Sequence, residues 1–179
     1  MRLIYISIFL LVSNSALCEG SLELSQNIRI EYEKLSDKIV KEITNGNLSY
    51  FYEYSPVLGL VMDNPKEREE LKLVLKEKVK ELENHNKNIN FKIENKNYVC
   101  GLTFNNTSIV LEDVKYSFVI DGESKIENEQ QVYIYHQENW YVGKNESRTF
   151  NFFSKMNHSK TTGNEESLGH NECIKKLLF

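Results

Sequence analysis

The spacing of apolar residues changes once along this chain, from a helical period before residue 85 to alternation after residue 88. Apolar side chains three or four residues apart form one face of an α-helix, whereas side chains two residues apart share one face of a β-strand. The chain is therefore predicted to be α+β, with N-terminal helices packed on one face of a curved antiparallel sheet.

The first long helix is predicted over residues 24–45. Its end coincides with Asn45-Gly46-Asn47, where glycine accepts the left-handed conformation that terminates helices. Aromatic residues crowd the following segment, 48–56, which predicts a short helix or turn packed against the first helix. The apolar face of the long helix consists of Ile28, Tyr32, Leu35, Ile39 and Ile43.

The second long helix is predicted to begin at Asn64-Pro65 and to end near Asn84. Asn64 can cap it, Pro65 suits the first helical position, and Glu67 completes a capping box. Glutamates lead this helix and lysines dominate later, which is the order that the helix dipole favours.

Alternating segments follow, separated by turn residues. Asp121-Gly122 is a strong hairpin sequence, and Asn105-Asn106 is a further turn. The predicted strands cover residues 89–93, 98–104, 109–120 and 130–136, and a last strand begins at 140–142.

Residues 1–18 have the order of a secretory signal: a basic start, an apolar run and small residues at the end. The run is too short for a transmembrane helix, which needs roughly 20 residues, and no later segment resembles one. We expect an exported chain, secreted or periplasmic, that begins at Glu19. The alternative is lipid attachment at Cys18. One domain is predicted over 24–153, followed by a polar tail with an apolar end over 154–179.

Two cysteines remain after export, Cys100 and Cys173. Oxidising compartments favour disulfides, so a Cys100–Cys173 bridge is predicted, with two free thiols as the alternative. Five asparagines lie in N-x-S/T triplets and are glycosylation candidates if the source is eukaryotic. They are Asn47, Asn105, Asn106, Asn145 and Asn157.

Residues 26–144 resemble the nuclear transport factor 2-like (NTF2-like) superfamily, which includes ketosteroid isomerase and SnoaL-like proteins. The resemblance rests on the element order, on "ITNGNLSYFYEY" after the first helix, and on the closing pair "QVYIYHQENWYVG". It implies a cone-shaped α+β fold whose mouth forms a pocket. The cystatin fold is the nearest alternative, but the stretch from Gln130 to Ile134 lacks the glycine of its inhibitory Q-x-V-x-G hairpin.

The resemblance implies that an inward Asp or His could act as a base, because burial raises the pKa of a carboxylate. The candidate bases are Asp63, Asp113 and His136. Candidate pocket residues are Tyr98, Tyr116, Tyr133 and His136. No catalytic motif matches residue by residue, and solvated turn residues with core tyrosines are the alternative interpretation. No metal site, phosphate-binding loop or cofactor is predicted.

Two functions remain open from the sequence. The first is a noncatalytic binding protein that holds an apolar small molecule or a protein partner in the concave face of the sheet. The second is a small enzyme of isomerase or dehydratase type that uses the same pocket. The formal net charge of −4, with intermixed signs, argues against a nucleic-acid partner.

Overall fold

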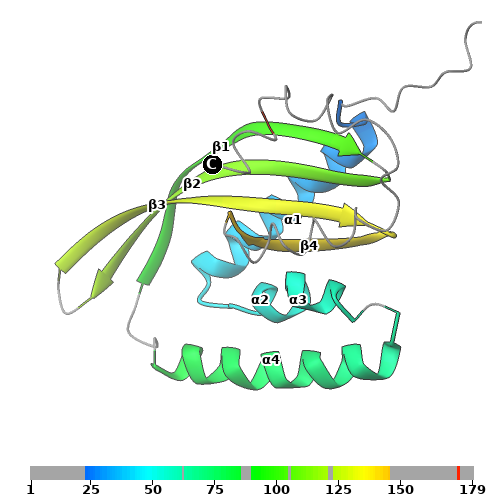
Figure 1. The fold of residues 1–179 in the computed structure, drawn as a ribbon. Helices are drawn as coiled ribbons and strands as arrows, with labels where there is room; N and C mark the ends of the chain where they lie inside the picture. Colours follow the sequence, from blue (N-terminus) through cyan, green and yellow to red (C-terminus); the bar gives the residue numbers. More distant parts are fainter. Residues whose placement is uncertain are drawn as a thin grey trace, which may run out of the picture.

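The structure is a computed structural model that describes residues 23–61, 63–85, 90–104, 106–120, 123–145 and Cys173. The predicted signal, residues 1–18, lies outside these ranges. So does the predicted tail over 154–179, except for Cys173. Within the described ranges the chain is α+β, as predicted, with helices that precede a four-stranded antiparallel sheet (Figure 1).

Helix α1 spans Gln26–Thr44 and confirms the first predicted helix. Ser25 caps it, because its side chain accepts a hydrogen bond from the Ile28 amide at 3.4 Å. The chain leaves the helix through Gly46, whose φ of 73° is the left-handed conformation expected there. The buried face of α1 includes four of the predicted apolar residues together with Ser36.

Two one-turn helices and a second long helix follow. Helix α2 spans Tyr50–Glu53, α3 spans Pro56–Gly59, and α4 spans Pro65–His85. Asn64 and Glu67 form the predicted capping interaction at the start of α4. The Asn64 carboxamide oxygen accepts from the Glu67 amide at 3.3 Å, and its nitrogen donates to the Glu67 carboxylate at 3.2 Å.

The sheet has the strand order β1-β2-β3-β4, and neighbours are antiparallel. The strands are β1 (Asn90–Phe104), β2 (Thr107–Ile120), β3 (Glu123–His136) and β4 (Asn139–Lys144). Two differences from the sequence prediction stand out. The two segments predicted before Asn105 are one strand with two register shifts, and β3 begins at Glu123 instead of Gln130. The added part of β3 is exposed, so it carries no apolar alternation that a sequence pattern could show.

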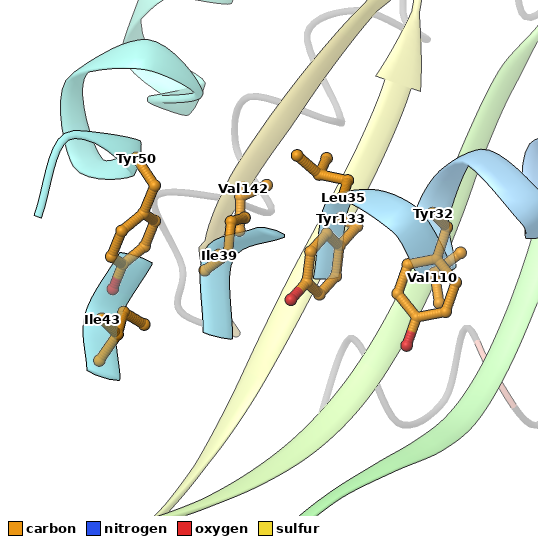
Figure 2. Close-up of a cluster of buried hydrophobic side chains, with 8 residues drawn as sticks. All are labelled: Tyr32, Leu35, Ile39, Ile43, Tyr50, Val110, Tyr133 and Val142. Atoms are coloured by element: carbon orange, nitrogen blue, oxygen red, sulfur yellow. The ribbon is translucent and has the colours of Figure 1, made fainter. Parts of the chain in front are cut away.

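Helices cover both faces of the sheet, whereas the sequence predicted one covered face. Val110, Tyr133 and Val142 are cross-strand neighbours and pack against α1 (Figure 2). On the opposite face, Ile109, Leu111, Val132, Ile134 and Tyr141 pack against Leu58 of α3 and against Leu71 and Leu75 of α4. Continuous burial from Thr107 to Glu112 in β2 and from Gln131 to Ile134 in β3 follows from this arrangement, because a strand segment covered on both faces loses its exposed side.

The chain between α1 and α4 passes around the edge strand β4. Tyr50 of α2 belongs to the cluster on the α1 face, whereas Leu58 of α3 belongs to the cluster on the opposite face. Between them, the Tyr54 carbonyl accepts a hydrogen bond from the Val142 amide of β4 at 2.6 Å. This contact occupies a backbone donor of an edge strand that would otherwise be open to pairing with another chain.

The structure joins Cys100 of β1 to Cys173, as the sequence suggested, across a separation of 73 residues. Cys100 packs against the core cluster of the α4 face, and Cys173 is buried. The bridge therefore ties a point near the C-terminus to the outer strand of the sheet. None of the helices in the described ranges is both long and apolar enough to cross a bilayer.

Candidate functional site

A cavity of about 240 Å³ lies on the α1 face of the sheet, beside the end of α1 and the start of α2. Most of its sheet side comes from the start of β1, the end of β2 and the first half of β3, the strand ends that extend to the left in Figure 1. Its apolar wall consists of Ile43, Leu48, Tyr50, Phe51, Phe91, Tyr116 and Phe118. Three charged residues, Glu127, Glu129 and Lys144, complete the lining.

Local structure explains how five aromatic side chains reach one cavity. On the helical side, Tyr50 and Phe51 of α2 pack with their ring centroids 4.1 Å apart. On the sheet side, Phe91 and Phe118 are direct cross-strand partners with centroids 5.6 Å apart. Aromatic pairs at these separations attract one another beyond the effect of their buried area.

The first register shift in β1, between Ile93 and Asn95, is what places Phe91 on this face. Side chains alternate along a strand, so an inserted residue changes which set of positions faces the helix. Before the shift, Phe91 and Ile93 pair with Phe118 and Tyr116. After it, Lys96 pairs with Val114. The extra residue places odd positions before it, and even positions between it and the second shift at Tyr98/Cys100, on the α1 side.

The charged lining has one ion pair. Lys144 Nζ of β4 lies 2.7 Å from Glu129 Oε2 of β3, and the Glu129 side chain is about one-fifth exposed. Glu127 is exposed and, among the described residues, has no lysine or arginine within ion-pair distance. The charged lining therefore carries one more acid than base.

Both tyrosines of the cavity are held in their neutral form. Burial raises the pKa of Tyr50 and of Tyr116 far above its ordinary value near 10. The negative charge of Glu129 raises both pKa values further. At neutral pH the cavity therefore presents two uncharged phenol groups, and the negative potential of Glu129 reaches them.

A buried carboxylate lies next to this cavity, between α1 and the sheet. Glu112 of β2 is only 2% exposed. Its oxygens accept from the Tyr32 hydroxyl at 2.6 Å, from Ser36 Oγ at 2.9 and 3.1 Å, and from the Tyr133 hydroxyl at 2.9 Å. An ionised carboxylate only accepts hydrogen bonds, so three hydroxyl donors match its needs. Lys96 donates to Ser36 Oγ at 3.0 Å and brings a positive charge to the edge of this cluster.

A hydrogen-bonded chain connects Glu112 to the cavity wall. The Tyr133 hydroxyl lies 3.0 Å from the Gln131 carboxamide oxygen, and the Gln131 nitrogen donates to the Tyr116 hydroxyl. Gln131 is itself buried. Each of these four side chains has a polar partner, so the hydrogen bonds between them fix the position of the Tyr116 ring that lines the cavity.

The buried tyrosines predict a steep loss of stability at alkaline pH. Burial raises the pKa of Tyr32, Tyr50 and Tyr133, with the charge of Glu112 adding to the effect on Tyr32 and Tyr133. These phenols ionise near pH 10 in the unfolded chain but keep their protons when folded. Their stabilisation is complete below about pH 10 and is lost as pH rises, by about 1.4 kcal/mol per pH unit for each tyrosine.

Urea unfolding from pH 8 to pH 11, followed together with tyrosinate absorbance, measures this loss. We expect absorbance from these tyrosines to appear only as the protein unfolds. Full tyrosinate absorbance near pH 10 in a chain that keeps its folded circular dichroism would contradict the burial described here.

The structure does not gather the four predicted pocket residues into one site. Tyr116 lines the cavity, and Tyr133 belongs to the adjoining network. Tyr98 is 41% exposed and lies beside Tyr32, with the Arg29 guanidinium 5.1 Å from its ring centre. His136 is at the other end of β3, where its Nδ1 lies 2.6 Å from Thr107 Oγ1. Along β3, His136 is seven residues from Glu129 of the cavity, which corresponds to roughly 24 Å in an extended strand.

The three candidate bases also lie outside the cavity. Asp63 is exposed in the connection between α3 and α4. Asp113 is exposed on the opposite face of the sheet, where its carboxylate accepts from the Gln130 carboxamide at 2.8 Å. His136 is at the distant end of β3, as described above.

Sequence reasoning missed Glu112, although the sequence contains a sign of it. Val110, Val114 and Phe118 alternate along β2 and are buried, and Glu112 occupies the same alternating set. An acidic residue at an apolar position of a strand is a candidate for burial with hydrogen-bond partners. The partners themselves come from α1 and β3 and cannot be identified from spacing.

The glycosylation candidates are found in different settings. Asn47 and Asn106 are exposed at chain reversals. Asn145 donates its side-chain nitrogen to the Gln130 carboxamide oxygen at 2.6 Å, so attachment of a glycan there would disturb a formed contact. Asn105 and Asn157 lie outside the described residues.

Within the described ranges, no group of three or more His, Cys, Asp or Glu side chains could hold a metal ion. No known protein family matches the chain, and no curated protein is similar enough to count as a relative. The chemistry of the cavity is therefore the main guide to function.

Proposed function

We propose that the chain is an exported binding protein that holds one small, mostly apolar molecule in the cavity on the α1 face. The observation that carries the proposal is the lining of this space: seven apolar side chains, five of them aromatic, around about 240 Å³. Ligand sites in proteins are typically concave and mostly apolar, with a few polar groups that orient the ligand. Tyr116 and Glu129 are such groups here.

The volume limits the size of the ligand. An apolar protein cavity of about 150 Å³ accepts benzene, which has six heavy atoms. By proportion, the present cavity accepts roughly ten heavy atoms, which is the size of one substituted aromatic ring. A long acyl chain or a steroid is too large for the space as it stands.

The placement of acids and bases supports binding rather than catalysis. A general base must lie within hydrogen-bond reach of the group that it deprotonates. Among the described residues, the three candidate bases lie away from the cavity. Two carboxylates do line it, but Glu129 is paired with Lys144 and Glu127 is exposed to water, so neither is the buried base that the resemblance implies. Glu112, which is closer, does not line the cavity, and its oxygens are already held by three hydroxyl groups.

Export and the NTF2-like resemblance belong to the same proposal. Export is supported by the order of basic, apolar and small residues over 1–18. The resemblance is supported by two long helices that precede an antiparallel sheet with α1 on one of its faces. A purified secreted product that begins at Glu19 is the expected result of N-terminal sequencing.

Binding of 2-phenylethanol tests the proposed site. This neutral molecule has one ring and a size that suits the cavity. From ordinary ligand efficiencies we expect a dissociation constant of about 0.1–1 mM and a stoichiometry of one, measured by NMR titration of the mature chain. Leu48→Trp places a larger side chain in the cavity wall and is expected to weaken binding at least about tenfold.

Ile126→Trp is the matched control, because Ile126 is exposed on β3 and does not line the cavity. It should leave the affinity unchanged. If Leu48→Trp bound 2-phenylethanol as well as the unaltered chain does, the ligand would occupy another place and the proposed site would be wrong.

A further inference from the structure

We infer that the natural ligand of the cavity is a small organic cation, an aromatic or aliphatic amine with an apolar body. This inference rests on the proposed function and specifies its ligand class. It follows from the aromatic walls, from the acidic side chains of the lining and from the ion pair that Lys144 forms with Glu129.

The walls suit a cation because aromatic rings carry a negative potential on their faces. An ammonium group within about 6 Å of a ring centre is attracted by this potential, and the attraction grows when water is excluded. Five rings line this cavity, from two different sides: Tyr50 and Phe51 from α2, and Phe91, Tyr116 and Phe118 from the sheet. Sites that bind quaternary ammonium groups are built from aromatic side chains in this way.

The charges at the lining favour the same sign of ligand. Glu127 and Glu129 are acidic, and among the described residues Lys144 is the one basic residue of the lining. Lys144 lies 2.7 Å from Glu129, so its charge is largely compensated. Glu127 has no ion-pair partner among the described residues and is exposed at the lining. An incoming ammonium therefore finds a carboxylate that is not committed to a lysine.

An anionic ligand of the same shape would be disfavoured at this site. Its carboxylate would have to separate Lys144 from Glu129 and would then lie near two negative charges. The chain as a whole is acidic, with a formal net charge of −4, so long-range attraction also favours cations.

Three probes of nearly equal size separate these alternatives: 2-phenylethylammonium, 2-phenylethanol and phenylacetate. Each is titrated into the mature chain at pH 7 and low ionic strength. We expect the cation to bind about tenfold more tightly than the neutral alcohol, and the anion to bind most weakly. A double variant, Glu127→Gln with Glu129→Gln, is expected to remove most of the cation's advantage and to leave 2-phenylethanol unaffected.

Glu31→Gln combined with Glu138→Gln is the matched control for net charge, because it also removes two acids, and both residues are exposed and do not line the cavity. It should leave all three affinities unchanged. If the alcohol or phenylacetate bound as tightly as the cation, the inferred ligand class would be wrong while the proposed binding function would stand. If none of the three probes bound, the proposed function itself would fail.

Discussion

Replacing Glu112 by alanine is expected to lower the free energy of unfolding by about 3–5 kcal/mol, because the change leaves three hydroxyl groups without their shared acceptor and opens a void. The hydroxyl groups of Tyr32, Ser36 and Tyr133 all lose their shared acceptor. A buried donor without a partner costs about 1–3 kcal/mol. Urea unfolding of the mature chain, followed by circular dichroism, measures the loss.

Two further variants show whether the loss comes from this network. Glu112→Gln keeps the volume and one acceptor oxygen, so its cost should be smaller, about 1–3 kcal/mol. Asp113→Ala changes the adjacent exposed acid and should cost no more than about 1 kcal/mol. Equal effects of Glu112→Ala and Asp113→Ala would mean that Glu112 is not buried among the three hydroxyls.

Breaking the Cys100–Cys173 bridge is expected to cost about 4 kcal/mol. The bridge closes a loop of 73 residues, and the chain-entropy treatment of a loop of this length gives a value of that size. Cys100→Ser combined with Cys173→Ser, and the unaltered chain under a strong reductant, should unfold at the same lower urea concentration. Mass spectrometry should show a gain of two hydrogen atoms on reduction.

Loss of the bridge is also expected to destabilise the sheet. Cys100 lies beside the second register shift of β1 and packs against the cluster that includes Ile109 and Leu111. The loss on reduction should therefore appear as lower stability of the whole domain. An unchanged unfolding midpoint after complete reduction would contradict a structural role for the bridge.

The sequence predicted those parts of the fold that depend on local chemistry. The capping interaction between Asn64 and Glu67 and the helix end at Gly46 both follow from residues within four positions of each other. Such local preferences are visible in one sequence without a structure. Both long helices were therefore placed within two residues of their ends.

Long-range packing could not be predicted in the same way. The first part of β3, from Glu123, is a strand because its backbone pairs with β2, although its side chains are exposed and, apart from Ile126, polar. Cover on the second face of the sheet comes from Leu58 and from α4, after the chain has passed around β4. Neither feature leaves a periodic pattern in its own segment, because both depend on partners far away in the sequence.

The candidate site was predicted only in part for the same reason. Tyr116 is predicted as a hydrogen-bond donor of the pocket and does line the cavity. Tyr98, predicted for the same role, and His136, predicted as a base, lie elsewhere, since strand register and the shifts in β1 decide which residues meet. The aromatic residues of α2 were recognised as a cluster, but their opposite wall, Phe91 and Phe118, required the structure.

The most direct test of the account is an NMR map of intermolecular contacts between the mature chain and 2-phenylethylammonium. We expect nuclear Overhauser effects from the ring protons of the ligand to Tyr116 and Phe118 of β2, and to Tyr50 or Phe51 of α2. Contacts confined to the exposed Leu73 and Val74 of α4, or no contacts at saturating ligand, would show that the aromatic cavity is not a binding site.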